Sequence, residues 1–148
     1  MSKGLILLVE DDEVLSNLFA GVLTEASFDV EQFHSLAEIE SRIDKEPVAS
    51  CVILDMYLPN GKATEFLDDF ENRHPSTRIP IIAITGSPSV TEDAVKLAGV
   101  QALLTKPVMP KELIQTVSQV IVDFVSNHDP IMRSVKELRA ELACVRSF

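Results

Sequence analysis

Four short apolar runs in this chain lead into polar residues that could together bind a divalent cation and a phosphoryl group. The runs are LILLV, CVIL, IIAI and ALLT, and they lead into Glu10-Asp11, Asp55, Thr85 and Lys106. Carboxylate oxygens are the ligands that hard divalent cations prefer. A hydroxyl and an ammonium can hold the oxygens of a phosphoryl group during its transfer. These residue types therefore predict phosphoryl chemistry, provided that the fold brings the four positions together.

The three carboxylates create an electrostatic problem. Carboxylates at the ends of neighbouring strands repel, so one must take up a proton unless a cation neutralises them. Mg²⁺ suits this position because it uses one or two carboxylates, keeps several waters and takes further oxygens from a phosphate. We predict that Asp11 and Asp55 are direct ligands. Glu10, with its longer side chain, is predicted to hold a metal-bound water.

Asp55 is the predicted nucleophile, because a carboxylate can accept a phosphoryl group to form an aspartyl phosphate. Mg²⁺ would hold one phosphoryl oxygen, the ammonium of Lys106 a second, and Thr85 with nearby backbone N–H groups a third. Lys106 precedes a proline, and an X-Pro bond at a strand end can fix a turn, cis in some cases, and aim the side chain. Asp12 and Glu13 have a simpler explanation, since acidic residues that open a helix complement its dipole.

The apolar runs have the length and β-branched content of strands that are buried on both faces. Strands are predicted at 5–9, 29–33, 49–54, 81–84 and 102–104, and helices at about 13–26, 35–45, 64–72, 89–99 and 110–125. Strands that alternate with helices lie parallel, and ligands bind at the edge formed by their carboxyl ends. The sequence therefore predicts an α/β fold that gathers the polar residues at one edge, with 29–33 as a half-exposed edge strand.

Two helices carry apolar stripes that should face the sheet. The first stripe is Val14, Leu15, Leu18, Phe19, Val22 and Leu23. The second is Leu113, Ile114, Val117, Val120, Ile121, Phe124 and Val125. Capping boxes are predicted at Ser35 with Glu38 and at Ser89 with Glu92.

A final segment follows Asp129-Pro130, which should break the chain. A helix is predicted at 131–146, and its apolar residues alternate spacings of four and three: Ile131, Val135, Leu138, Leu142 and Val145. This is a coiled-coil seam of barely two heptads. The helix either folds back on its own domain, or it serves as a dimerisation helix or as a linker toward an output domain.

Composition is that of one soluble domain with a short appendage. The 148 residues carry a formal net charge of −10, which argues against nucleic acid as a direct partner. No apolar run approaches the roughly 20 residues of a membrane helix. The N-terminus lacks the longer apolar core of a signal peptide, so we predict a cytoplasmic protein. Cys51 and Cys144 are accordingly predicted to be reduced thiols.

The motifs LILLVEDDEVL, VILDMYLP, IIAITG and LLTKP occur in order and at suitable spacing. Over about residues 3–127 the chain resembles a receiver domain of two-component response regulators. The resemblance implies the flavodoxin-like fold of the single-domain chemotaxis regulators, with five parallel strands in the order 2-1-3-4-5 and five surrounding helices. It divides the chain into a receiver domain, 1–128, and a C-terminal helical extension, 129–148.

The resemblance also implies a function. Glu10 and Asp11 would form an acidic pocket for Mg²⁺, or Mn²⁺, with Asp55 and the backbone carbonyl of Tyr57. Asp55 would accept a phosphoryl group from a sensor histidine kinase or a phosphotransfer protein. The chain would be a signalling phosphoacceptor that promotes only its own phosphotransfer and dephosphorylation.

Signal output would follow from the same resemblance. Thr85 would be the switch hydroxyl, and Lys106 would contact the phosphate and precede a cis proline. Phosphorylation would shift the face made by the fourth helix, fifth strand and fifth helix, which a partner would bind. This face and the C-terminal helix are the two candidate surfaces for a homodimer.

Three departures from the family pattern should affect the switch. The loop after Pro59 is Asn60-Gly61-Lys62-Ala63, where many receivers have Met-Asp-Gly. Leu103 stands where an aromatic residue is common. Tyr57 and Ser87 should influence how long the phosphate lasts, because Tyr57 is bulky beside the path of attacking water.

Other functional classes fit less well. A phosphatase of the haloacid dehalogenase type would have a second aspartate where Tyr57 stands, and a flavodoxin-like nucleotide binder would not place acidic residues in its phosphate loop. A degenerate receiver that acts only as a phosphorylation-independent interaction module is the main alternative. His34, His74 and His128 lie far apart in sequence, so we predict ordinary surface histidines and no metal site there.

Overall fold

The computed structural model describes residues 2–56, 63–73, 79–86 and 100–128, together with Leu138 and Leu142. In chain order the elements are β1 (Leu5–Val9), α1 (Glu13–Glu25), β2 (Asp29–Phe33), α2 (Leu36–Arg42), β3 (Cys51–Asp55), α3 (Ala63–Arg73), β4 (Ile81–Thr85), β5 (Ala102–Thr105) and α5 (Pro110–His128). All five predicted strands are present, with bounds that differ by two residues at most. The helix predicted at 89–99, with its capping box, and the predicted break at Asp129-Pro130 lie outside the described residues.

The five strands form one parallel sheet in the order β2-β1-β3-β4-β5, which confirms the predicted topology. β3 and β4 are buried throughout, whereas β2 is a half-exposed edge strand. The register pairs Val9 with Leu54, Asp55 with Ile84, and Thr85 with Thr105. Residues 10, 55, 85 and 106 therefore come to the same edge of the sheet.

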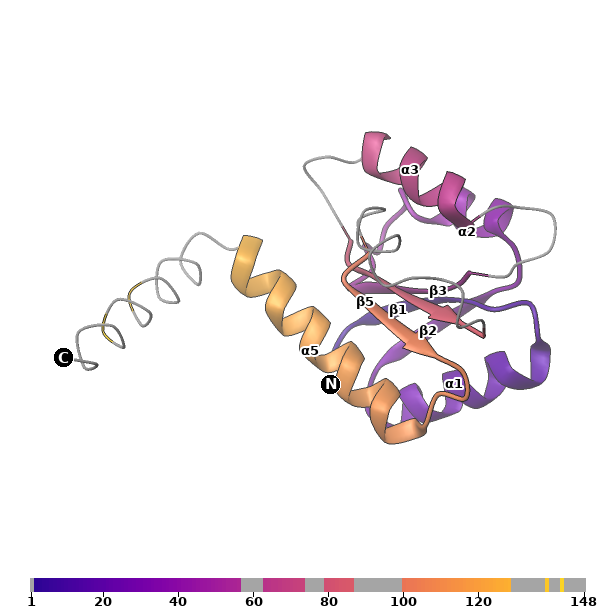
Figure 1. Cartoon of the computed structure of the whole chain (residues 1–148), viewed down its shortest axis with the longest axis horizontal. Helices are drawn as coiled ribbons and strands as arrows, with labels where there is room; N and C mark the ends of the chain where they lie inside the picture. Colours follow the sequence, from indigo (N-terminus) through magenta and orange to yellow (C-terminus); the bar gives the residue numbers. More distant parts are fainter. Residues whose placement is uncertain are drawn as a thin grey trace.

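Helices cover both faces of the sheet (Figure 1). α1 and α5 pack on one face, over a core that includes Ile6, Leu8, Phe19, Leu23, Ile53, Ile82, Leu113 and Val117. α2 and α3 cover the other face, over Leu7, Val9, Ile39, Val52, Leu54, Phe66, Leu67 and Phe70. Successive residues of β1 and β3 belong to opposite cores, as the alternation of side chains along a strand requires. Each central strand is thus fixed from both sides.

The buried face of α1 is narrower than the sequence pattern predicts. Phe19 is buried, but Val14 is 80% exposed and Leu18 is 56% exposed, so their predicted burial is wrong. Ser16 is buried instead, and its hydroxyl accepts a hydrogen bond of 2.9 Å from Gln32 Nε2 on the edge strand. α1 packs along a single line against the sheet, and the outer part of a wide apolar stripe is therefore left in solvent.

α5 shows the same limit at its C-terminal end. Leu113 and Val117 are buried as predicted, whereas Val125 is 51% exposed because the last turns of α5 extend past the sheet (Figure 1). α5 has 19 residues and is the longest described helix. None of the described helices combines the length and the apolar character needed to cross a bilayer.

Side chains fix the ends of the helices near the sheet. Asp12 caps α1, since its Oδ1 accepts a hydrogen bond of 3.1 Å from the backbone N–H of Leu15. The predicted capping box at α2 is present in part: Ser35 Oγ accepts from the N–H of Glu38. Glu38 Oε2 in turn accepts from the N–H of His34 rather than from that of Ser35. α2 ends at Arg42, three residues earlier than predicted. The guanidinium of Arg42 donates hydrogen bonds to Glu31 on β2 and to two backbone carbonyls of the following loop.

Cys51 lies in β3 and is fully buried. Burial raises the pKa of its thiol, so it stays protonated, and it is a free cysteine, in agreement with the predicted reduced thiol. Cys144 lies outside the described residues.

Two leucines of α1 test how narrow its buried face is. Leu23→Ala should lower the free energy of unfolding by about 2–5 kcal/mol, because it opens a cavity in the core. Leu18→Ala removes the same atoms from a half-exposed position and should cost less than about 1 kcal/mol. Urea denaturation of both variants measures the difference. Equal losses would contradict the packing of α1 described above.

Candidate functional site

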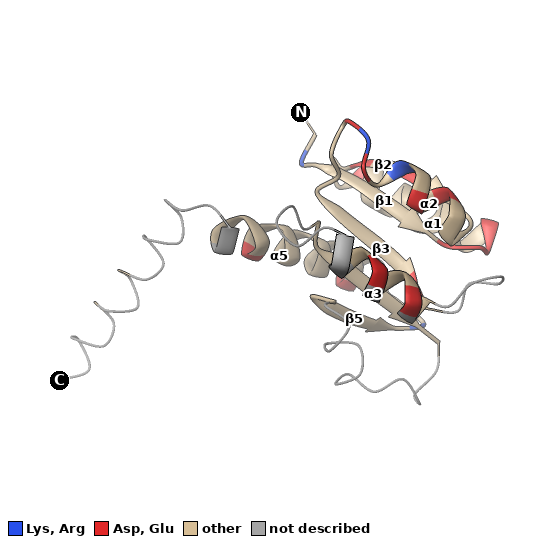
Figure 2. Ribbon diagram, turned by 90° about the horizontal axis from the view of Figure 1, so that it is seen from above, with Lys and Arg blue, Asp and Glu red and all other residues tan. Residues whose placement is uncertain are grey.

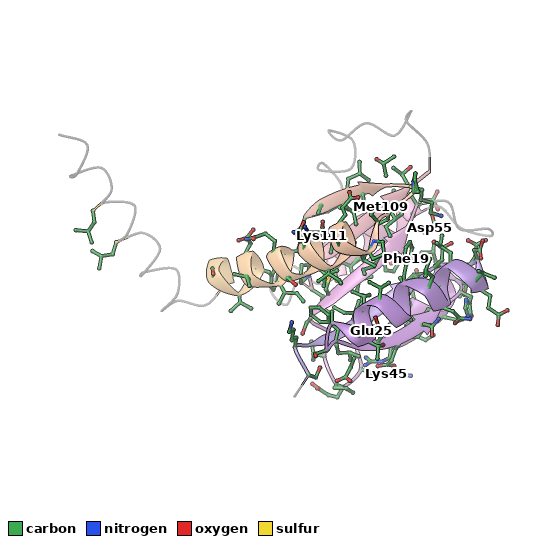
Figure 3. All side chains as sticks on the ribbon, turned by 90° about the horizontal axis from the view of Figure 1, so that it is seen from below. Phe19, Glu25, Lys45, Asp55, Met109 and Lys111 are labelled. Atoms are coloured by element: carbon green, nitrogen blue, oxygen red, sulfur yellow. The ribbon has the colours of Figure 1, made fainter. Side chains whose placement is uncertain are left out.

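The predicted site residues meet at the carboxyl edge of the sheet. Glu10 follows β1, Asp55 ends β3, Thr85 ends β4, and Lys106 follows β5. Glu10, Asp55 and Thr85 are each at most 2% exposed. Figure 3 shows Asp55 at the end of the molecule where α1 and α5 begin. The structure therefore brings together the residues that the four sequence motifs singled out.

Lys106 is the cation of this cluster. Its Nζ lies 3.3 Å from Asp55 Oδ2, to which it donates a hydrogen bond, and 3.4 Å from Glu10 Oε2. The side chain is 29% exposed, so the ammonium faces two buried carboxylates from a partly open position. The Lys106-Pro107 peptide bond is cis, as predicted. A second cis bond, Glu46-Pro47, was not predicted.

The single positive charge of Lys106 does not balance the negative charges of the buried carboxylates Glu10 and Asp55. Burial, and next the neighbouring carboxylate of Asp55, raise the pKa of Glu10 from 4.5 to about 7, although Lys106 and the N–H of Asp12 act to lower it. Burial acts to lower the pKa of Lys106, but the negative charges of Asp55 and Glu10 outweigh it and the pKa is raised. Lys106 thus stays protonated, and Glu10 is the group on which the excess negative charge is relieved.

The donor set fits a hard divalent cation. One carboxylate oxygen from each of Glu10, Asp11 and Asp55 lies within 4.8 Å of the others. Oε2 of Glu10 is buried and makes no hydrogen bond to a described residue, although Lys106 lies at ion-pair distance. A buried carboxylate oxygen in that state can accept from a metal-bound water. Oxygen-only donors with an exposed member, Asp11, match Mg²⁺, which keeps part of its water shell.

The backbone of Glu10 is held by the neighbouring edge strand. Its N–H donates to the carbonyl of Phe33 at 3.0 Å, and His34 Nδ1 lies 3.0 Å from its carbonyl oxygen. Its own Oε1 accepts from the N–H of Asp12 at 3.3 Å. The contact of His34 was not predicted from the sequence. The register of β1 with β2 could have revealed this contact. It pairs Val9 with Phe33, so the residues that follow them, Glu10 and His34, lie side by side.

Some of the residues that the sequence analysis named lie outside the described part of the chain. They are Tyr57, Ser87, Asn60, Gly61 and Lys62, together with the predicted surface histidine His74. Ala63 is the first residue of α3 and is buried. Leu103 is half-buried in β5 and packs against the core on the α2 and α3 face. His34 is exposed, in agreement with the prediction of a surface residue.

Acidic residues dominate the surface of the described part of the chain. Figure 2 shows them on α1, α2, α3 and α5, with few basic segments. This agrees with the net charge of −10. Such a field attracts cations and repels polyanions.

Comparison with known proteins identifies the same site-bearing region. The family model of the response regulator receiver domain matches residues 6–118. Response regulator protein PilR of Pseudomonas aeruginosa is 31% identical over 108 residues, which are 73% of this chain and 24% of PilR. Transcriptional regulatory protein VxrB of Vibrio cholerae is 34% identical over 112 residues, 75% of this chain and 43% of VxrB. The chain thus spans less than half the length of these two relatives.

Other relatives and solved structures extend the comparison. The polar-differentiation response regulator DivK of Brucella ovis is 26% identical and is covered over 99% of its length. A CheY-like receiver structure from Methanospirillum hungatei superposes with a TM-score of 0.72 at 25% identity, over 80% of this chain and 94% of that one. NtrX of Brucella abortus superposes with a TM-score of 0.73 at 22% identity, over 93% of this chain and 30% of NtrX. The last likeness shows the fold alone.

Raising the pH without divalent cations should destabilise the protein through Glu10. Its pKa is about 7 in the folded protein and 4.5 ordinarily, so between these values the folded state holds a proton that the unfolded chain has released. The stabilising contribution is fully present below about pH 4.5 and is lost as the pH rises to about 7. Relative to Glu10→Gln, the wild type should lose at most about 3 kcal/mol over this window.

Chemical denaturation in a chelating buffer, at a series of pH values across the window, measures this difference. Saturating Mg²⁺ should stabilise the wild type most at the upper end of the window, because the cation binds the ionised carboxylate. A difference between wild type and Glu10→Gln that does not change with pH would contradict the raised pKa.

Proposed function

Because the chain belongs to the family of response regulator receiver domains, we propose that it accepts a phosphoryl group on Asp55 in a Mg²⁺-dependent reaction. The observation that carries the proposal is the placement of Asp55: a buried carboxylate beside the Lys106 ammonium and within a cluster of three carboxylates. A receiver is a phosphoacceptor in signalling. The chain then passes the state of Asp55 to a partner.

In the proposed transfer an oxygen of Asp55 forms a bond to phosphorus as the bond from phosphorus to the donor nitrogen breaks. Mg²⁺, with Mn²⁺ as the alternative, would be held by Asp11, Asp55 and the backbone carbonyl of Tyr57, and supplies positive charge to the phosphoryl oxygens. Glu10, whose carboxylate is buried, would orient a water molecule bound to that cation. The ammonium of Lys106, already paired with Asp55, is placed to contact a second phosphoryl oxygen.

Thr85 is proposed to report the state of Asp55. It is buried at the end of β4, the strand that pairs with β3. The phosphoryl dianion would attract its hydroxyl and shift β4 and the chain that follows it, so that the face formed with β5 and α5 changes. Leu103, half-buried in β5, takes the place of the common aromatic residue, so this switch works without an inward-turning ring.

The proposed phosphodonor is a sensor histidine kinase or a phosphotransfer protein, in the cytoplasm. The chain promotes its own phosphotransfer and, with attacking water, its own dephosphorylation. Tyr57 and Ser87 are proposed to influence the lifetime of the phosphate. No direct contact with nucleic acid or membrane is proposed for residues 1–128, in keeping with the acidic surface.

Labelling with a small phosphodonor tests the proposal. Incubation with acetyl phosphate and Mg²⁺ should add one phosphoryl group to the wild type, as measured by intact mass, and none in a chelating buffer. Asp55→Asn should not be labelled, because an amide is no phosphoryl acceptor. Asp12→Asn is the matched control: it removes a nearby exposed charge but keeps a residue that caps a helix.

The control should be labelled like the wild type. If the wild type neither gains mass nor binds Mg²⁺, the degenerate interaction module becomes the better interpretation. Labelling of Asp55→Asn at the wild-type level would place the phosphoryl group on another residue.

The C-terminal extension, 129–148, is proposed to pair with a second copy. Leu138 and Leu142 are helical, one turn apart, and 56% and 53% exposed, so they do not pack on their own domain. A two-heptad helix is marginal alone in water. A partner helix would cover the two leucines and stabilise it.

Sedimentation equilibrium tests this pairing. The wild type should form a dimer that dissociates on dilution, and Leu138→Asp with Leu142→Asp should shift it to a monomer. Val14→Asp, which places the same charge on another exposed apolar position, should leave the dimer intact. A wild type that is monomeric at high concentration, phosphorylated or not, would exclude the dimer.

A further inference from the structure

We infer that His34 is a positioning residue of the cation site, which acts by orienting the peptide group that carries Asp11. The inference rests on the proposed cation site, though not on phosphorylation. His34 follows β2 and lies beside Glu10, because β1 and β2 are neighbours in the sheet and their last residues pair.

The contact fixes the proton on His34. Its Nδ1 lies 3.0 Å from the backbone carbonyl oxygen of Glu10. A carbonyl oxygen only accepts hydrogen bonds, so Nδ1 must carry the hydrogen and donate it. Nε2 is left for solvent, since the side chain is exposed. His34 therefore holds the carbonyl of Glu10 through a single nitrogen, Nδ1.

The carbonyl of Glu10 and the N–H of Asp11 belong to one planar peptide group. His34 bonds that group at its oxygen, and the N–H of Glu10 is bonded to the carbonyl of Phe33 at 3.0 Å. The two contacts together hold the chain on both sides of the Glu10 Cα. The direction in which the chain enters Asp11 is therefore set by the end of β2.

Asp11 needs this support more than the other two carboxylates do. Glu10 and Asp55 are 1% and 2% exposed, so packing fixes them, whereas Asp11 is exposed. A ligand on an exposed residue depends on its backbone for its position. Loss of the His34 contact should therefore lower the affinity for the cation without changing the chemistry at Asp55.

The end of α2 supports the same contact. The backbone N–H of His34 donates to Glu38 Oε2 at 3.2 Å, and Ser35 caps the helix. These bonds fix the loop at the start of α2. They give a matched control, because the loop can be loosened at Ser35 without removing the bond to Glu10.

Isothermal titration with Mg²⁺, for full-length variants, tests the inference. His34→Phe keeps the ring volume but has no donor, and its dissociation constant should rise about fivefold, the equivalent of one net hydrogen bond. His34→Asn offers a side-chain N–H near the position of Nδ1 and should restore the wild-type value. Ser35→Ala should lower the melting temperature with little change in the dissociation constant.

Labelling by acetyl phosphate supplies a second readout. In His34→Phe the rate should fall at low Mg²⁺ and return to the wild-type rate at saturating Mg²⁺, because only the binding step is affected. The inference is overturned if His34→Phe binds Mg²⁺ like the wild type, if His34→Asn is as weak as His34→Phe, or if Ser35→Ala weakens binding equally. Absence of labelling in the wild type would count against the proposed function only, since Mg²⁺ affinities are measured separately.

Discussion

The chemistry of this protein depends on the ion pairs between Lys106 and the two buried carboxylates beside it, those of Asp55 and Glu10. One ammonium, 3.3 Å from Asp55 and 3.4 Å from Glu10, faces more negative charge than it can balance. In water these groups would each be solvated, but at the sheet edge two of them are buried, where an unbalanced charge is costly. The protein relieves the imbalance by raising the pKa of Glu10 to about 7. A divalent cation relieves it more completely, and a phosphoryl group then finds positive charge in place.

The fold stabilises this cluster of charges through the helices that pack on both faces of the strands, not through contacts at the site itself. Each central strand contributes alternate side chains to the two cores, so the strand ends are held by apolar packing on both faces of the sheet. Carboxylates that repel one another are kept together by apolar contacts made elsewhere. This explains why the site residues lie at the last position of a strand or directly after it, where the chain leaves the sheet and can present a polar group without breaking the core.

The sequence allowed prediction of the buried strands, which are apolar runs, and of the polar residues at their ends. Buried strands are recognised by continuous runs of apolar, β-branched residues. Because parallel strands have their carboxyl ends at one edge of the sheet, the polar residues at these ends, Glu10, Asp55, Thr85 and Lys106, could be predicted to lie together. The crowding of carboxylates also predicted that one would take up a proton unless a cation neutralised them, and burial beside Asp55 raises the pKa of Glu10 to about 7. What failed was the width of the buried face of α1. Val14 and Leu18 are apolar at helical spacing, yet burial depends on how closely a helix meets the sheet, which no pattern within the helix contains.

His34 was missed for a related reason. Its contact joins two loops that are 24 residues apart in sequence, and it follows only from strand register, not from residue type. Ser16 is a similar case, because a hydroxyl within a helix gains its partner, Gln32, from the strand beside it. Local patterns predict elements well, while contacts between elements need the topology first.

α5 begins four residues after Lys106 and ends at the opposite side of the sheet (Figure 1). Its 19 residues make a rod of about 28 Å. A rod pivoted near one end magnifies small motions at the other: a tilt of about 5° in the first turn displaces the last turn by roughly 2.5 Å. A tilt of α5 at its first turn, four residues after Lys106, would therefore be magnified at the residue where 129–148 begins.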